Sequence, residues 1–367
     1  MVEVVSLDAA EDPWVSTLGL KVHAAGDGAR GYGYSPRFVP WLKKNSSNFD
    51  SVVVNGVWNY ASFGTWRALS GSTTPYFVFP HGMLDPWFKR TYPLKHLKKW
   101  MYWPWAEYRV LRDANAVLYT CEEERLLARE SFWLYRCRER VTTFGSADPA
   151  GSPEVQREVF LNAYPDLRHK RLILFLGRLH KKKGCDLLIK AFASVCDRDP
   201  TLHLVMAGPD QTGWQKQLEQ LANNLGISKR ITWTGMLSGD YKWGAMRTAD
   251  AFILPSHQEN FGISIIEAMA CRTPVLITRP VNIWREIEQD GAGLVNADTV
   301  SGVTQLLSEW LDKSDTERAS FKTNARLSFE RRFEIRKAAL TLAEILADSL
   351  KVPTASPNQS VSEPAHV

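Results

Sequence analysis

Two glutamates, Glu259 and Glu267, lie close together in the sequence. Glu259 lies in the segment that joins a predicted buried strand to a predicted helix, and Glu267 lies inside that helix. Residues 251–255 form an apolar run of strand length, and apolar residues recur at helical spacing between 263 and 270. The start of a helix suits a phosphate, because its N–H groups are free and its dipole is positive there. Carboxylates would repel that phosphate, so we expect them to accept hydrogen bonds from sugar hydroxyls. A pair of solvated surface glutamates is the alternative.

A basic segment, GRLHKKKG at 177–184, directly follows a second apolar run at 171–176. Arg178 can direct two N–H donors to phosphate oxygens, and Lys183 can add a compact positive charge. Gly184 is placed to open a helix. A solvated lysine loop is the alternative, but the position directly after a strand favours an anion site.

Apolar runs of strand length recur along both halves of the chain, and each ends at glycine, proline or polar residues. They are 2–7, 50–55, 75–79, 116–119, 171–176, 202–207, 231–233 and 251–255. Strands that alternate with helical segments predict parallel sheets covered on both faces, with ligands at the carboxyl ends of the strands. We therefore expect an α/β protein with two Rossmann-like domains, 1–150 and 165–328, that face each other across a cleft. The polar tail 352–367 is predicted to be disordered.

Composition excludes several classes of protein. The chain has 367 residues, 44% of them hydrophobic, and a formal net charge of +5. No apolar run approaches the roughly 20 residues of a membrane-spanning helix, and no signal-peptide pattern is present. Five cysteines at wide spacing favour a reducing compartment over a disulfide framework or a zinc site. We expect a cytoplasmic protein, and the net charge does not indicate nucleic-acid binding.

The segment 86–106 is basic and aromatic, with no acidic residue until Glu107. Three interpretations are open. Binding of single-stranded nucleic acid has no other support. The second interpretation is a solvated helix that is packed by its aromatic residues. The third interpretation is docking on an anionic membrane leaflet, where lysine and arginine contact head groups and tryptophan and tyrosine lie at the interface.

Two further patterns are interpreted as ordinary loops. Asp197-Arg198-Asp199 spells the Asp-x-Asp pattern that can hold a metal, but it precedes Pro200 and a strand instead of following one. We interpret it as turn chemistry and expect no metal requirement. The glycine-rich residues 26–34 lack the spacing of a dinucleotide fingerprint and are predicted to form a flexible loop before a helix near Ser35.

The segment 251–275 is similar to the signature of retaining glycosyltransferases of family 4, the group 1 type with the GT-B fold, whose two glutamates are separated by seven residues. Matching positions are Ser256, Glu259, Phe261, Gly262, Glu267, Ala268, Ala270 and Pro274. The stretch 177–184 resembles the Gly-Arg-x(4)-Lys-Gly motif of the same family. The PHGMLDPW stretch at 80–87 is similar to enzymes of bacterial exopolysaccharide clusters. Relatives carry a first strand and a Gly-rich loop ahead of residues 2–7, and we expect this domain to lack them.

The resemblance implies roles for the donor-side residues. Arg178 and Lys183 would hold the donor diphosphate and stabilise its developing charge without a metal. Glu259 and the backbone of residues 260–262 would face the sugar, and Glu267 would hold the ribose. The remaining backbone contacts would come from Asn260, Phe261, Gly262, Ile263, Ser264 and, for the base, Leu237.

On the other domain, the resemblance implies that His81 reaches the transferring sugar. Asp85 and Glu122 are candidates to bind acceptor hydroxyls. A predicted amphipathic helix at about 329–350 would cross back to the first domain.

The function implied is a retaining, metal-independent transfer of a hexose from a nucleoside-diphosphate sugar, with UDP-glucose as the expected type. The acceptor would be a saccharide or a lipid-linked saccharide in polysaccharide biosynthesis, and peripheral association with the inner face of the cytoplasmic membrane stays open. A sugar-nucleotide-binding protein without turnover is the alternative. An epimerase is disfavoured, because its additional catalytic carboxylates are not evident.

Overall fold

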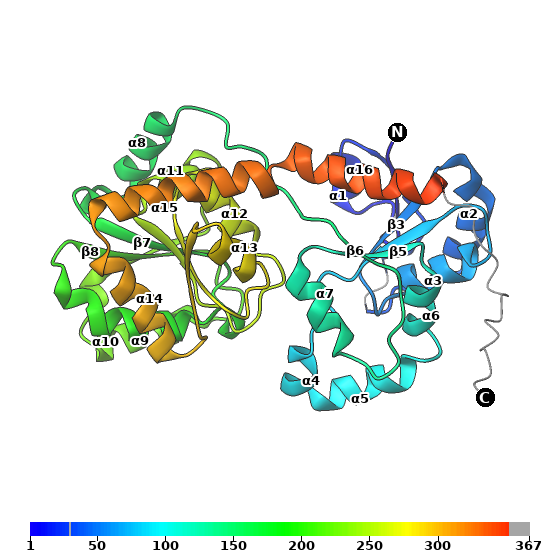
Figure 1. The fold of residues 1–367 in the computed structure, drawn as a ribbon, viewed down its shortest axis with the longest axis horizontal. Coiled ribbons are helices and arrows are strands. Elements are labelled where there is room, and N and C mark those ends of the chain that lie inside the picture. The colour runs from blue at the N-terminus through cyan, green and yellow to red at the C-terminus, as the bar shows by residue number, and fades with distance from the viewer. Residues whose placement is uncertain (29–30, 352–367) are drawn as a thin grey trace, which may run out of the picture.

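The computed structural model describes residues 1–28 and 31–351, so the disordered-tail prediction and residues 29–30 of the glycine-rich segment lie outside the described part. The chain forms two α/β halves that are joined by the linker after β6 and by the C-terminal helices (Figure 1).

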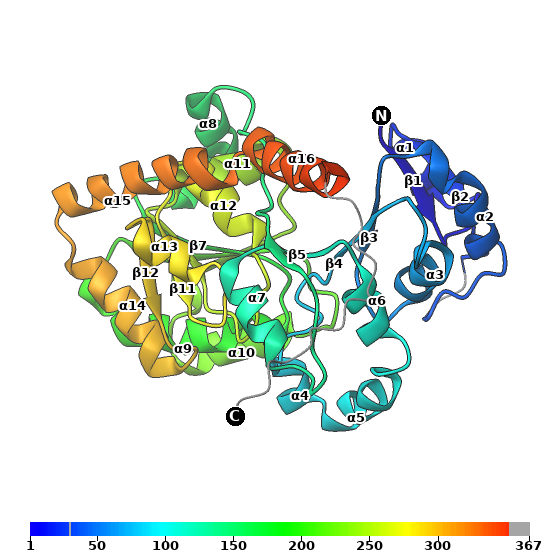
Figure 2. The ribbon, with the colours of Figure 1, turned by 45° about the vertical axis from the view of Figure 1, so that its right-hand side comes forward.

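The C-terminal half contains a six-stranded sheet in the order β12-β11-β10-β7-β8-β9, in which all neighbours are parallel. Its strands are β7 (Arg171–Leu176), β8 (Leu202–Ala207), β9 (Ile231–Gly235), β10 (Ala251–Leu254), β11 (Val275–Thr278) and β12 (Gly293–Asn296). The sequence analysis did not identify the last two. Six helices cover the two faces: α9 (Cys185–Val195), α10 (Gln215–Asn224) and α14 (Val300–Asp312) on one, and α11 (Gly239–Thr248), α12 (Ile263–Ala270) and α15 (Asp315–Ser328) on the other (Figures 1 and 2).

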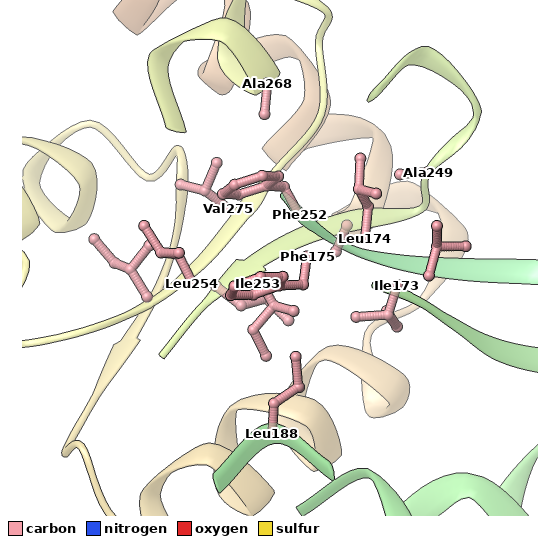
Figure 3. Packing of buried hydrophobic residues seen from close by; sticks show 14 of the residues in the cluster. Ile173, Leu174, Phe175, Leu188, Ala249, Phe252, Ile253, Leu254, Ala268 and Val275 are labelled. Carbon is pink, nitrogen blue, oxygen red and sulfur yellow. The ribbon is translucent and has the colours of Figure 1, made fainter. Parts of the chain in front are cut away.

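The core of this half is continuous through the sheet. Figure 3 shows Phe252 on the side that faces Ala268 of α12, and Phe175 on the side that faces Leu188 of α9. All four residues are fully buried. Because side chains alternate across each strand, uninterrupted apolar runs supply both layers at once.

The N-terminal half contains two separate parallel sheets. Four strands pair in the order β3-β4-β5-β6: β3 (Val52–Asn55), β4 (Tyr76–Phe79), β5 (Ala116–Tyr119) and β6 (Glu139–Val141). A two-stranded sheet pairs β1 (Glu3–Ser6) with β2 (Lys21–Ala24), which the sequence analysis did not identify. The prediction that residues 2–7 form a buried strand is wrong in its burial, because β1 is only half-buried and is packed against a small cluster around Phe38 and Tyr60.

The C-terminal segment returns to the N-terminal sheet. Instead of one helix starting near residue 329, α15 continues through a π-helical turn (Phe329–Phe333) and α16 (Ile335–Lys351) follows. Figure 1 shows α16 lying over the N-terminal half. Its Leu342 and Leu346 pack against the buried cluster that contains Phe77 and Phe79 of β4. The opposite face of the sheet packs against α3 (Tyr60–Leu69) and α6 (Glu107–Asp113).

The helical elements of the N-terminal half are short. The predicted helix near Ser35 is α2 (Phe38–Asn45), and segment 86–106 forms α4 (Trp87–Thr91) and α5 (Pro93–Tyr102). The remaining α-helices are α1 (Pro13–Thr17) and α7 (Glu122–Arg129) in this half, and α8 (Pro153–Ala163) and α13 (Trp284–Gln289) in the C-terminal half. Within the described residues, no helix combines the length and hydropathy needed to cross a membrane.

Two buried carboxylates fasten the loops at the carboxyl ends of β3 to β5. Glu124 accepts hydrogen bonds from the backbone N–H of Gly82 at 2.5 Å and of Thr120 at 2.7 Å. Glu107 accepts from the backbone N–H of Trp58 at 2.9 Å and from the Ser62 hydroxyl at 3.0 Å. These bonds fix loops that no regular sheet or helix hydrogen bond holds.

Replacing Gly184 by alanine should destabilise the protein. Gly184 has φ +64°, and a Cβ there would lie 2.1 Å from the Pro255 carbonyl oxygen, so the loop would have to move. We expect the free energy of unfolding, measured in urea, to fall by about 2–4 kcal/mol. Gly213→Ala is the control, because its φ is +71° but nothing lies within 4 Å, so about 1 kcal/mol of backbone strain remains. Equal losses of unfolding free energy in the two variants would contradict the close approach of Gly184 to the Pro255 carbonyl oxygen.

The stability of the N-terminal half should fall as pH rises through the titration of Glu107. Burial raises the pKa of Glu107 from 4.5 to about 7. Between these values the unfolded chain releases a proton that the folded protein keeps, so the raised pKa favours unfolding with increasing pH. Glu107→Gln removes this effect. The stability of the variant relative to the natural protein should increase by about 3 kcal/mol from pH 4 to pH 8 in urea unfolding. A difference in unfolding free energy between the two proteins that does not change with pH would contradict a raised pKa of Glu107.

Candidate active site

Lys183 and Glu259 form an ion pair that joins the loops after β7 and β10. Both side chains are largely buried, with 16% and 18% of their surface exposed. The structure thus brings together one residue of each sequence motif. The Glu259 loop is held in turn by the loop after β11, because the Glu259 N–H donates to Pro280 O at 2.9 Å and Asn282 N–H donates to Glu259 O at 3.0 Å. Sequence reasoning missed this support, since it depends on a strand it did not identify.

The N-terminus of α12 lies directly beyond Glu259. Gly262 has φ +78° and precedes the helix, and no side chain caps it. The backbone N–H groups of Ile263 and Ser264 therefore begin a helix whose dipole favours an anion. Phe261 anchors the turn by edge contacts with the rings of Phe144 and Phe333.

Glu267 lies one turn further along α12 and pairs with Lys242 of α11 at 2.9 Å. The Lys242 ammonium also lies 3.9 Å from the centre of the Trp243 ring. Sequence reasoning did not single out Lys242, because one lysine on an amphipathic helix carries no motif. The contact places it beside the carboxylate that the family resemblance assigns to ribose.

Arg178 and Leu237 occupy the ends of β7 and β9. Arg178 is exposed, and among the described residues its guanidinium makes no hydrogen bond or ion pair. Leu237 is partly buried against the C-terminal core. The backbone N–H of Gly208 donates to Gly235 O at 2.7 Å, which draws the loops after β8 and β9 together.

His81 lies at the carboxyl end of β4 with φ +51°, a backbone conformation rare for a residue with a side chain. Its Nε2 lies 2.9 Å from Asn55 Oδ1, and its ring stacks on Phe79 with centroids 5.4 Å apart. Burial lowers the pKa of His81, so the ring is neutral at neutral pH. The next residue, Gly82, meets the opposite domain: a Cβ there would lie 2.7 Å from Asn260 Oδ1.

Polar contacts cross between the two halves beside this point. Asp85 Oδ2 accepts a hydrogen bond from Gln258 Nε2 at 3.0 Å, and Thr120 Oγ1 accepts one from Asn260 Nδ2 at 3.2 Å. Asp85 therefore lies at the boundary with the donor-side loops. Glu122 is placed differently, since its carboxylate pairs with Arg125 on its own helix.

The Asp-x-Asp pattern has the contacts of a turn. Asp199 Oδ1 accepts from the N–H of Thr201 at 2.8 Å and from its hydroxyl at 2.7 Å, and Arg198 pairs with Asp312. Across residues 1–28 and 31–351, no group of three or more His, Cys, Asp or Glu side chains has the arrangement of a metal site.

Two family models match the chain: the glycosyl transferase 4-like domain over residues 1–164 and glycosyl transferases group 1 over residues 160–328. A D-inositol 3-phosphate glycosyltransferase of Corynebacterium urealyticum is 28% identical over 197 residues, which are 52% of this chain and 46% of that protein. Mannosylfructose-phosphate synthase of Agrobacterium fabrum is 35% identical over 123 residues, 32% of this chain and 27% of that protein. The matched segments thus span less than half of either relative.

Solved structures share the fold over nearly the whole chain. HepE of Anabaena in complex with UDP has a TM-score of 0.75 at 17% identity, covering 94% of this chain and 92% of that one. A glycosyltransferase of Rickettsia africae has a TM-score of 0.73 at 15% identity, covering 95% and 90%. With both family models matched, one over each domain, the chain belongs to the group 1 glycosyltransferases of family 4 and has the GT-B fold.

Proposed function

We propose that the protein is a retaining, metal-independent glycosyltransferase that moves a hexose from a UDP-hexose, such as UDP-glucose, to a saccharide or lipid-linked saccharide in polysaccharide biosynthesis. The observation that carries this proposal is the anion site between two glutamates. The Lys183–Glu259 ion pair lies just before the start of α12, which has no side-chain cap, and Glu267 lies one turn further along that helix. Arg178 follows β7 in the same loop as Lys183, and among the described residues its guanidinium makes no ion pair. The solved structures of HepE with UDP and with UDP-glucose show that this fold accepts such a donor in a relative.

In the proposed reaction, the donor diphosphate lies between the amides of Ile263 and Ser264 and the side chains of Arg178 and Lys183. The bond between the anomeric carbon and the β-phosphate oxygen breaks, and its electron pair stays on that oxygen. The two cations stabilise the charge that develops there. The acceptor oxygen bonds to the anomeric carbon on the same face, and its proton passes to the leaving phosphate.

The remaining residues orient the substrate. Glu259 accepts hydrogen bonds from sugar hydroxyls once Lys183 turns to the diphosphate, and Glu267 accepts from the ribose. Backbone groups at Leu237 pair with the base. The neutral His81 ring reaches the sugar from the opposite domain, and its orientation is fixed by Asn55.

We also propose that the protein docks on the inner face of the cytoplasmic membrane through α5. No residue of α5 is buried, and Leu94, Leu97 and Met101 recur at helical spacing along one side of it. Trp105 follows shortly after the helix and is also exposed. The exposed fractions of these side chains are 82% for Leu94, 55% for Leu97, 60% for Met101 and 71% for Trp105. Lys95 and Lys98 are exposed beside them, so the surface combines apolar insertion with attraction to anionic lipid. Lys99 is excluded from it, because its ammonium lies 4.6 Å from the Trp58 ring centre.

Glu267→Ala should weaken UDP binding by roughly 1–3 kcal/mol, because a charged acceptor of ribose hydrogen bonds is lost. Isothermal titration calorimetry measures this directly. Glu288→Ala, an exposed glutamate on α13, is the matched control and should leave the affinity unchanged. Natural affinity in the Glu267 variant would remove that residue from the donor site.

The same calorimetry tests metal independence, since UDP affinity should persist in a chelator. A turnover assay then separates transferase from simple binder. Tight UDP binding without UDP release from any UDP-sugar and acceptor pair would contradict transfer.

The membrane surface is tested by flotation with vesicles. The protein should float with phosphatidylcholine vesicles that contain 30% phosphatidylglycerol. It should float less with pure phosphatidylcholine, because the lysines are attracted to anionic head groups that these vesicles lack. Leu97→Ser/Met101→Ser should abolish flotation, and Lys95→Ala/Lys98→Ala should remove the difference between the two vesicles. Lys43→Ala/Lys44→Ala, two exposed lysines on α2, is the control. Equal flotation of all variants would overturn docking through α5.

A further inference from the structure

A cavity of about 1150 Å³ lies between the two halves, next to the Asp85–Gln258 hydrogen bond. One wall comes from residues 85–92 and α7 of the N-terminal half. The other comes from the loops after β7, β10 and β11 and from α10. The volume exceeds what one monosaccharide needs, and of the residues given a donor or acceptor role above only Asp85 lines it.

The charges of this cavity are unbalanced. Its four carboxylates already have partners: Asp85 bonds Gln258, Glu123 pairs with Arg285, Asp186 with Lys190 and Asp298 with His257. The basic side chains are different. Within the described residues, no ion pair is made by Arg90, Lys181, Lys182 or Arg279. The lining therefore offers four basic side chains that make no ion pair, as an anionic ligand requires.

Lys182 is one of these basic side chains, and its charged form is disfavoured by partial burial. Its ammonium lies 5.3 Å from the centre of the Trp87 ring and 5.2 Å from that of Phe88. Burial lowers the pKa of Lys182, and the nearby charges of Glu259 and Asp85 offset only part of this effect. A bound anion would compensate this desolvated charge.

The cavity also offers surfaces for a sugar. Trp87, Tyr92 and Trp214 line it, and leucines of α10 complete an apolar wall. Aromatic and apolar walls with few directed polar groups are typical of small-molecule sites. An occupant with both an anionic group and an apolar or pyranose body fits this lining.

The cavity borders the donor site through consecutive residues. Lys182 and Gln258 line the cavity, whereas their chain neighbours Lys183 and Glu259 pair with each other at the donor site. The two loops are joined there, since His257 N–H donates to Lys182 O at 2.9 Å. The Lys183–Glu259 ion pair, which the proposed function places at the sugar end of the donor, is therefore adjacent in the chain to residues that line the cavity.

We propose that this cavity binds the phosphate or diphosphate ester of an acceptor saccharide and so sets the acceptor class of the transferase. The inference rests on the proposed function, because it needs a donor at Lys183 and Glu259. The anionic group lies against Lys181, Lys182 and Arg279. The saccharide extends past Asp85 towards the donor sugar.

The binding test uses pyrophosphate as the probe, titrated by calorimetry into protein saturated with UDP so that the donor site is blocked. Lys181→Ala/Arg279→Ala should weaken pyrophosphate binding at least tenfold, because two of the unpaired cations are lost, and should leave UDP affinity unchanged. Lys43→Ala/Lys44→Ala removes the same charge from α2 and should bind as the natural protein does. Equal pyrophosphate affinity in both double variants, with UDP bound normally, would overturn the cavity site alone. Failure of UDP to bind the natural protein would instead overturn the proposed function.

Two acceptor mimics then separate the sources of the anion. One is glucose 1-phosphate, a soluble sugar phosphate, and the other is a short-chain prenyl-diphosphate glucose in detergent. Weaker binding of either mimic to Lys181→Ala/Arg279→Ala supports the site, and the mimic that the natural protein binds more tightly identifies the source. If neither mimic responds to the double substitution, the acceptor is not held by its phosphate here.

Discussion

The C-terminal half depends on one constraint: two loops at neighbouring strand ends must keep opposite charges in contact beside a helix start that no side chain caps. The Lys183–Glu259 pair does this across β7 and β10. Glycines make the approach feasible, since Gly184 passes too close to Pro255 for a side chain and Gly262 turns the chain into α12. In the absence of an anion the two charges neutralise each other. A bound diphosphate and sugar would give each a partner of its own.

The two halves are held to each other by contacts of different kinds. Near the site, the joint includes polar pairs such as Asp85–Gln258 and Arg285–Glu123 beside a ring contact between Phe144 and Phe261. Away from the site it is apolar, because α16 packs on β4 and β5. Polar contacts exchange readily with water, whereas the apolar seam does not. The arrangement is therefore suited to opening at the cleft while α16 keeps the halves connected.

Several buried strands could be predicted from the sequence, since β5, β7 and β8 begin and end where their apolar runs do, although the equally buried β11 was missed. Short or half-exposed strands such as β2 and β6 carry no such run. The donor motifs were likewise visible, because their residues are close in sequence. Lys242 and Glu107 were not, since each acts through a partner that is distant in the chain, 25 residues away for Lys242 and 49 for Glu107. Such contacts exist only once the tertiary structure has formed.

The same geometry relates the donor site to the cavity beside it. Just beyond the ends of β7 and β10, consecutive residues serve different spaces: Lys183 and Glu259 meet each other, and Lys182 and Gln258 line the cavity. Lys182 and Gln258 also reach the N-terminal half, through the Trp87 ring and the Asp85 carboxylate. A shift of either loop would therefore alter both spaces together. The backbone that carries these consecutive residues therefore links the Lys183–Glu259 ion pair to the wall of the cavity.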